Sequence, residues 1–227
     1  IDNIYYIIMN MIVAKSLNGG IGLAKSLPWK LTKDLKLFKK LTTGLFNGNN
    51  TDFTKTNPTL AMNAIIMGRT TWDGLPIKPL PNRFNIVLSR KMDYTHVNIN
   101  DAKNIVLEKN IDNIDNQIKL VNPKQTWVIG GKEIYNEFLK TNKIENIVMT
   151  NILTSFPVDT YLDSIDEINY KHNSNFQLYW SSNIIEDSGL KFNIEIYNNN
   201  IDKFKQIDDG NKNCFFLSAA IEDILSN

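Results

Sequence analysis

Cysteine and histidine are scarce in this chain of 227 residues. The single cysteine, Cys214, excludes an internal disulfide. Two histidines, His96 and His172, are too few to suggest a structural zinc site. We therefore expect no metal centre, and a reducing, cytoplasmic compartment fits this composition.

The chain also lacks a charge imbalance and a long apolar run. Its formal net charge is +1, so nothing indicates a surface for nucleic acid or for an anionic membrane. The longest apolar run, Ile4 to Ala14, is interrupted by Asn10 and is too short to span a bilayer. No basic residues precede it, as they would in a signal peptide. We expect neither nucleic-acid nor membrane partners.

Short apolar segments alternate with helical ones along most of the chain. With 42% hydrophobic and 22% charged residues, this length allows one large domain with a substantial core. The alternation predicts an α/β fold with a mostly parallel central sheet, helices on both faces and a C-terminal antiparallel hairpin. The expected strands are Ile4–Ala14, Ala64–Met67, Phe84–Leu88, Thr126–Ile129, Ile147–Thr150 and Phe192–Tyr197, the last paired with Tyr179–Ile185.

Between these strands we expect helices and two polar insertions. Helices are predicted from Thr32 to about Leu41, from Arg69, and from Lys132 to about Lys140. Thr43–Met62 is expected to be a long surface loop, and Asp101–Asn122 a helix with ragged loops, because both are rich in polar residues.

Glycine, hydroxyl and arginine residues follow several predicted strands directly. In parallel sheets, ligands lie beyond the carboxyl ends of the strands, where helix N-termini favour anions. One crevice could therefore hold a phosphorylated dinucleotide, although a motif of this kind on its own is more typical of a plain turn. These motifs are Gly20 to Gly22, Gly68 to Thr71, Ser89-Arg90 and Gly130-Gly131.

Asp34 is the one acid at the edge of an otherwise apolar helix stripe. Thr32 suits the N-cap of that helix, and Leu31, Leu35 and Phe38 are spaced to form one apolar face. Asp34 could be a solvated acid, stabilised by the helix dipole by roughly 0.3–1 kcal/mol. It could instead be a working group whose pKa is raised by burial and lowered by the helix N-terminus. The spacing leaves both interpretations open.

Taken in order, these motifs resemble the dihydrofolate reductase family from about Ile4 to Tyr197. The resemblance implies NADPH-dependent reduction of 7,8-dihydrofolate to 5,6,7,8-tetrahydrofolate by hydride transfer. Each match is short, but the ordered set is specific. The matching residues are Ile12-Val13-Ala14, Gly20-Ile21-Gly22, Leu27-Pro28-Trp29, Asp34, Ile66-Met67-Gly68-Arg69-Thr70-Thr71-Trp72, Arg83, Leu88-Ser89-Arg90, Ile129-Gly130-Gly131, Tyr135 and Thr150.

The resemblance also implies the residues that act on the substrate. Asp34 would bind the pteridine through N3 and the 2-amino group and help bring a proton to N5, supported by Thr150 and a water. Trp29 and Leu27 would close the site, and Arg83 would pair with the glutamate α-carboxylate. The full set of implied substrate-binding residues is Ile12, Val13, Asp34, Leu35, Phe38, Leu75, Leu80, Arg83, Ile129, Tyr135 and Thr150.

For the cofactor, the resemblance implies NADPH rather than NADH. Ser89 and Arg90 would take the adenosine 2′-phosphate, and Gly19 to Lys25 would form a mobile loop over the nicotinamide. The implied cofactor-binding residues are Ala14, Gly20, Ile21, Gly68, Arg69, Thr70, Thr71, Leu88, Ser89, Arg90, Gly130, Gly131, Lys132, Glu133 and Ile134.

The chain departs from the family pattern in length, in Lys30 after Trp29, and at Gly74, where many relatives carry a hydroxyl. We expect residues 1–198 to form the catalytic domain, and residues 199–227 a linker and an amphipathic helix that uses Phe215, Ala219, Ile221 and Leu225. This tail resembles the junction of bifunctional chains in which thymidylate synthase follows. The alternative is a C-terminal helix docked on its own domain.

Two other functions compete with an active reductase that binds dihydrofolate and antifolate inhibitors. One is a catalytically silent dinucleotide-binding module that regulates a fused enzyme. The other is the pyrimidine reductase of riboflavin synthesis, against which Asp34 and the Leu-Pro-Trp run argue.

Overall fold

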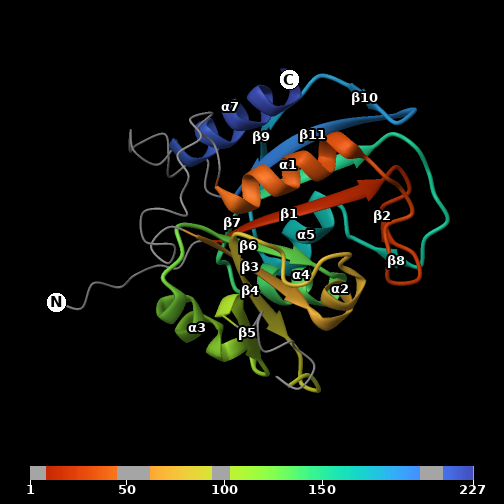
Figure 1. Cartoon of the computed structure of the whole chain (residues 1–227). Coiled ribbons are helices and arrows are strands. Elements are labelled where there is room, and N and C mark those ends of the chain that lie inside the picture. The colour runs from red at the N-terminus through yellow and green to blue at the C-terminus, as the bar shows by residue number, and fades with distance from the viewer. Residues whose placement is uncertain (1–8, 45–61, 94–102, 200–211, 227) are drawn as a thin grey trace.

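A twisted sheet forms the centre of the computed structural model, which describes residues 9–44, 62–93, 103–199 and 212–226 (Figure 1). Among these residues the sheet has nine strands, in the order β10-β11-β7-β1-β6-β3-β4-β5, with β9 also paired to β11. The strands are β1 (Met9–Ser16), β3 (Asn63–Gly68), β4 (Arg83–Leu88), β5 (Ile105–Glu108), β6 (Thr126–Gly130), β7 (Ile144–Ile152), β9 (Gln177–Ser181), β10 (Ile185–Asp187) and β11 (Leu190–Asn198).

The pairing confirms the predicted fold class. β7, β1, β6, β3, β4 and β5 run parallel, whereas β11 runs antiparallel to β7, β9 and β10. The expected partner of β11, Tyr179–Ile185, is divided between β9 and β10. A separate ribbon pairs β2 (Gly20–Gly22) with β8 (Thr160–Tyr161), where only a loop was expected.

Helices cover both faces of the sheet, and the sheet separates two apolar clusters. On one face lie α1 (Thr32–Thr43), α2 (Arg69–Gly74) and α7 (Lys212–Ser226), which contribute Leu37, Trp72 and Ile221 to the first cluster. On the other face lie α3 (Ile114–Val121), α4 (Lys132–Leu139) and α5 (Ile165–His172). No helix among the described residues is both long and apolar enough to cross a membrane.

The start and the buried face of α1 differ from the prediction. The N-cap is Leu31, in an extended conformation and without a side-chain cap, so Thr32 is the first helical residue rather than the cap. Leu37 and Leu41 form the buried stripe, while Leu35 is 50% exposed. The helix turns this apolar side chain away from the core.

The segment Asp101–Asn122 contains a strand that the polar composition concealed. Residues 101 and 102 lie outside the described part; β5 then pairs with β4 and is followed by a 3-10 turn (Ile111–Asn113) and α3. Ile114 and Ile118 are buried in α3, as their spacing predicted. A four-residue edge strand has too short an apolar run to stand out in sequence.

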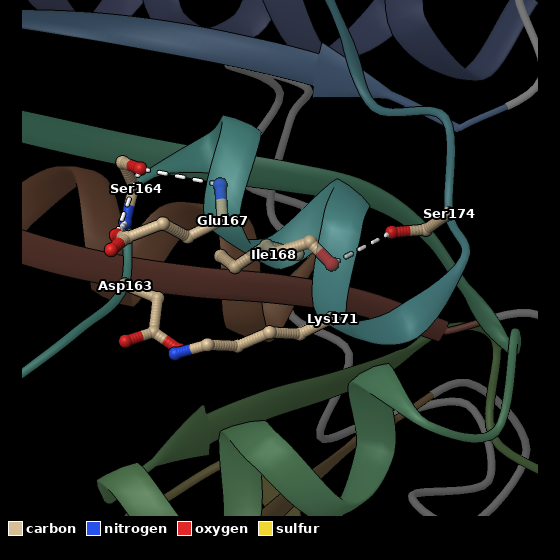
Figure 2. Close-up of polar contacts among 6 residues, drawn as sticks. All are labelled: Asp163, Ser164, Glu167, Ile168, Lys171 and Ser174. Atoms are coloured by element: carbon tan, nitrogen blue, oxygen red, sulfur yellow. Dashed lines mark hydrogen bonds and ion pairs between the residues drawn. The ribbon is translucent and has the colours of Figure 1, made fainter.

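Helix α5 was not predicted, and local polar contacts explain how it forms (Figure 2). Ser164 and Glu167 make a reciprocal capping box, in which Glu167 Oε2 accepts from Ser164 N at 2.8 Å and Ser164 Oγ accepts from Glu167 N at 3.3 Å. Lys171, in the last turn, reaches back along the helix to pair with Asp163, just before the N-cap, at 2.7 Å. Only Ile168 of this helix is buried, which leaves little apolar pattern to read.

The C-terminal helix α7 docks on the same domain. It packs against α1 and β11, and Leu217, Ile221 and Ile224 face the core. Of the apolar face predicted for it, Ile221 is correct, Leu225 is half-buried and Ala219 is exposed. The Phe215 side chain, most of the Thr43–Met62 loop and linker residues 200–211 lie outside the described part.

A ladder of buried asparagines joins the three strands at the centre of the sheet. Asn146 on β7 donates to Asn10 on β1 at 2.9 Å and accepts from Asn198 on β11 at 2.8 Å. Asn198 therefore belongs to the sheet, as the last residue of β11. Buried amides that must meet fix the register of these strands.

Candidate active site

A hydrogen bond between β7 and α1 defines the site. Thr150 Oγ1 donates to Asp34 Oδ1 at 2.7 Å, although the two residues are 116 positions apart. Thr150 is 2% exposed because β7 lies inside the sheet, and Asp34 is in the first turn of α1. The structure thus brings together the two polar groups that the sequence selected for the substrate.

Burial is the main influence on Asp34. It raises the pKa of the Asp34 carboxyl, the hydrogen bond from Thr150 opposes this shift, and the nearby charge of Asp187 adds to it. Asp34 is half-buried and bonded to a buried threonine, so the interpretation of Asp34 as a solvated helix-end acid is wrong. A carboxyl with a raised pKa in a partly buried position can exchange a proton nearer to neutral pH.

Trp29 lies just before α1 and presents an unpartnered donor. Its indole is 8% exposed and packs on Phe156, with ring centroids 5.5 Å apart. Within the described part of the chain, its buried Nε1 has no hydrogen-bond partner. Buried donors are rarely left unpaired, so this group is suited to a ligand or a bound water. Leu27, two residues earlier, is 51% exposed.

The apolar residues predicted to contact the substrate lie on the α1 face of the sheet. Phe38, Leu75 and Leu80 are partly buried and pack against the first cluster, which also contains Ile12 and Ile129. Ala14, predicted to contact the cofactor, packs against the same cluster. Leu35 is more exposed than any of these. Val13 is different, because its side chain belongs to the cluster on the opposite face.

Arg83 is a buried cation at the start of β4. It is 3% exposed, donates to Thr42 Oγ1 at 2.7 Å and to the Pro81 carbonyl at 3.0 Å, and lies over the Phe38 ring. Burial lowers its pKa to about 10, so it stays charged at neutral pH. No carboxylate of the described residues pairs with it, which makes an anionic ligand the expected partner.

Tyr135 joins α4 to the central strand. Its hydroxyl donates to the Ile12 carbonyl at 2.8 Å, and burial raises the pKa of the phenol. Gly130 has a φ of +113°, and a Cβ there would lie 3.0 Å from the Tyr135 ring. A side chain at Gly130 would therefore disturb this contact. The Ile12 oxygen has a second lone pair for another donor.

The glycine and hydroxyl motifs lie together at the carboxyl ends of neighbouring strands. β3 lies between β4 and β6, with Gly68 opposite Leu88 and Met67 opposite Gly130. A Cβ at Gly68 would come within 2.9 Å of Ile134, and one at Gly131 within 3.5 Å of Thr71 Oγ1. The turns after β3 and β6 therefore touch, and β4 ends beside β3.

The polar side chains at this edge are partly engaged with the protein itself. Arg69 forms an exposed ion pair with Asp73 at 3.3 Å, and Ser89 Oγ accepts from the backbone of Lys91 and Met92. Four of the predicted cofactor residues that follow these strands have exposed side chains: Thr70, Arg90, Lys132 and Glu133.

The loop after β1 is held by a distant segment. Gly20 is buried, and a Cβ there would overlap the Val158 side chain. Ala24 N donates to Asp159 Oδ2 at 2.8 Å, and Asn18 donates to the Phe156 carbonyl at 2.9 Å. The close approach at Gly20 is therefore to the protein, whereas sequence reasoning assigned it to a ligand. Ile21 packs in the second cluster.

Position 74 leaves no room for a side chain. A Cβ on Gly74 would lie 2.7 Å from the Lys25 carbonyl, so the loop approaches α2 more closely than any side chain would allow.

Sequence reasoning also missed Phe156, Asp159 and Asp187, which contact the site from the C-terminal half of the chain. No local pattern marks them.

We expect Asp34→Asn to stabilise the fold at neutral pH. A raised pKa means that the folded state binds the proton more tightly than the unfolded state, so wild-type stability falls as pH rises from the ordinary value of 3.8 through the raised one. The amide avoids this loss. Thermal unfolding across pH should show a higher Tm for the variant above that window and no gain below it.

The matched control is Asp166→Asn, which changes an exposed acid in the first turn of α5. It should lower the Tm slightly at neutral pH, because a favourable helix-dipole charge is lost. An Asp34→Asn variant that is destabilised to the same extent at every pH would contradict the burial of the carboxylate.

Comparison with known proteins agrees with the motif order. The family model described as "Dihydrofolate reductase" matches residues 8–47 and 49–198. The chain is 33% identical over 165 residues to "Dihydrofolate reductase" of Heliothis virescens, covering 70% of this chain and 80% of that protein. It is 31% identical over 209 residues to "Viral dihydrofolate reductase" of Saimiriine herpesvirus 2, covering 87% of this chain and 88% of that protein.

Another relative is longer. The chain is 32% identical over 203 residues to "Bifunctional dihydrofolate reductase-thymidylate synthase" of Paramecium tetraurelia, which covers 88% of this chain but 37% of that protein.

Proposed function

The chain belongs to the dihydrofolate reductase family of enzymes, and from this premise we propose that it reduces 7,8-dihydrofolate to 5,6,7,8-tetrahydrofolate with NADPH. The observation that carries the proposal is the Asp34 carboxyl, held by Thr150 beside exposed apolar side chains. A silent dinucleotide-binding module would have no need to bury this acid. The bifunctional relatives further support a fused thymidylate synthase, which the coding sequence after Asn227 would reveal.

Asp34 would bind the pteridine by paired hydrogen bonds. Its Oδ1 already accepts from Thr150, so Oδ2 and the remaining lone pairs can accept from N3–H and the 2-amino group of the ring. The raised pKa favours sharing a proton with the bound ring, which helps N5 to become protonated. Trp29 Nε1 supplies a further donor at the edge of the site.

Arg83 would bind the other end of the substrate. A guanidinium buried among Thr42, Pro81 and Phe38 is suited to one carboxylate, and the glutamate α-carboxylate of folate provides it. Leu35, Phe38, Leu75 and Leu80 would line the path between the two charged ends.

The turns at the carboxyl ends of β3, β4 and β6 fit a phosphorylated dinucleotide. Gly68, Gly130 and Gly131 let the backbone approach closely, and Thr70, Arg90 and Lys132 add hydroxyl and cationic donors. The bound nicotinamide would supply the hydride for C6 of the substrate. The chain's own work is to align the two rings, exclude water and guide the proton to N5.

Purified protein should oxidise NADPH only when dihydrofolate is present. The loss of nicotinamide absorbance measures this, and a 2,4-diaminopteridine antifolate should stop it. Protein that binds NADPH with an intact fold but shows no turnover would favour the silent module instead.

Asp34→Asn should lower the rate by roughly 10²–10⁴-fold, about 3–5 kcal/mol, because a positioned acid–base group is lost. Steady-state rates across pH should show the deficit shrinking at low pH, where the substrate arrives protonated. Asp166→Asn, at the exposed start of α5, should leave the rate unchanged. A deficit independent of pH would contradict the proposed role in protonation.

Arg90→Ala should weaken NADPH binding by roughly 10–100-fold, the usual range for a charge-assisted hydrogen bond to phosphate. NADH, which has no 2′-phosphate, should bind almost as before. Equilibrium titration of both cofactors measures the difference, with Lys91→Ala as the neighbouring control. Equal weakening of NADPH and NADH by Arg90→Ala would move the 2′-phosphate site elsewhere.

A further inference from the structure

Helix α1 carries Asp34 but cannot cap its own N-terminus. The residue at the N-cap, Leu31, is apolar and 1% exposed, and it makes no side-chain cap. The first intrahelical bond runs from Leu35 N to the Leu31 carbonyl, so the N–H groups before it need acceptors elsewhere. Asp34 sits within this turn, and its position depends on how firmly the turn is held.

The missing acceptor comes from the β10–β11 hairpin, 154 residues further along the chain. Lys33 N donates to Asp187 Oδ2 at 2.8 Å, the bond that an N-cap side chain normally makes with the second helical residue. Figure 1 shows this hairpin beside the start of α1. Asp187 thus serves as an N-cap from a different element.

The hairpin is a firm support for this cap. Ser188 and Gly189 at its tip both have positive φ, 55° and 76°, as a two-residue type I′ turn requires. Asp187 pairs with Leu190 across the turn, and Ser188 Oγ donates to Asp187 Oδ1 at 3.1 Å. The aspartate is therefore fixed through both of its oxygens.

Strand β11 of this hairpin also supports Thr150, the residue that holds the Asp34 side chain. β11 pairs with β7, and Ile194 lies opposite Thr150, the donor to Asp34 Oδ1. The start of α1 is therefore held at two points. The β10–β11 hairpin binds the backbone of Lys33, and β7 binds the side chain of Asp34. The groups that act on the Asp34 carboxyl from packed elements are Thr150, which is neutral, and Asp187, whose charge raises the Asp34 pKa after the larger effect of burial.

We propose that Asp187 is a positioning residue of the active site, which caps α1 from the β10–β11 hairpin and thereby sets the placement of the Asp34 carboxyl. The inference rests on the proposed role of Asp34 in dihydrofolate reduction. It assigns Asp187 no contact with substrate or cofactor.

Three variants separate the cap from the charge. Asp187→Ala removes both, Asp187→Asn keeps an acceptor oxygen and removes the charge, and Glu186→Gln removes the adjacent charge, whose side chain points to the other side of the strand. Asp187→Ala should lower kcat/KM for dihydrofolate by about 2- to 30-fold, the range expected for a lost cap. Asp187→Asn should restore the rate to within about 3-fold of wild type.

A pH profile distinguishes positioning from support of the fold alone. Without the Asp187 charge the Asp34 pKa should fall, so kcat/KM should decline from a lower pH in both Asp187 variants and not in Glu186→Gln. The Kd for NADPH should be unchanged in all three, because the proposed cofactor residues lie at the ends of β3, β4 and β6. Asp187→Ala that lowers only the Tm, with wild-type rate and pH profile, would overturn the proposal.

Two measurements on the free protein keep this test independent of turnover. Carboxyl ¹³C titration should show the Asp34 pKa shifted downward in both Asp187 variants, and amide exchange at Lys33 should quicken in Asp187→Ala only. If the wild type fails to reduce dihydrofolate but these shifts appear, the proposed function fails while the cap stands. If neither shift appears, the cap itself is wrong.

Discussion

The hydrogen bond from Thr150 to Asp34 is the contact on which the site depends. It places an ionisable group of a surface helix against a strand inside the sheet, where burial raises the pKa of the carboxyl. The bond can form only because β7 is in register with β1 and β11. Buried amides at Asn10, Asn146 and Asn198 help to fix that register. A polar ladder at one end of the strands thus determines the geometry four residues further along β7.

In the proposed function, the two faces of the sheet and the carboxyl ends of its strands have different roles. On the α1 face, apolar side chains and the buried cation Arg83 suit a flat ring with an acidic tail. At the carboxyl ends of β3, β4 and β6, the glycine turns lie beside one another, where the proposal places the cofactor phosphates. The opposite face, with α3, α4 and α5, serves mainly to pack the sheet.

Local sequence was enough for the parts whose signal lies within a few residues. The buried strands β3 and β6, the glycine turns after them and the α/β alternation are all legible as short patterns. The stripe of α1 was misread because Leu35 is apolar without facing the core. β5 was missed because an edge strand has a brief apolar run. Asp187 could not be found at all, since its partner Lys33 is distant in sequence and its own surroundings describe only a turn.

Helix α7 changes where the folded unit ends. The family match stops at residue 198, yet Leu217, Ile221 and Ile224 beyond it are buried with α1 in the first cluster. Lys40 and Asp223 also pair across the two helices at 2.8 Å. A fragment trimmed at the family boundary would leave the back of the Asp34 helix uncovered. Any polypeptide that continues past α7 would therefore begin at a helix that packs directly on α1, the helix that carries Asp34.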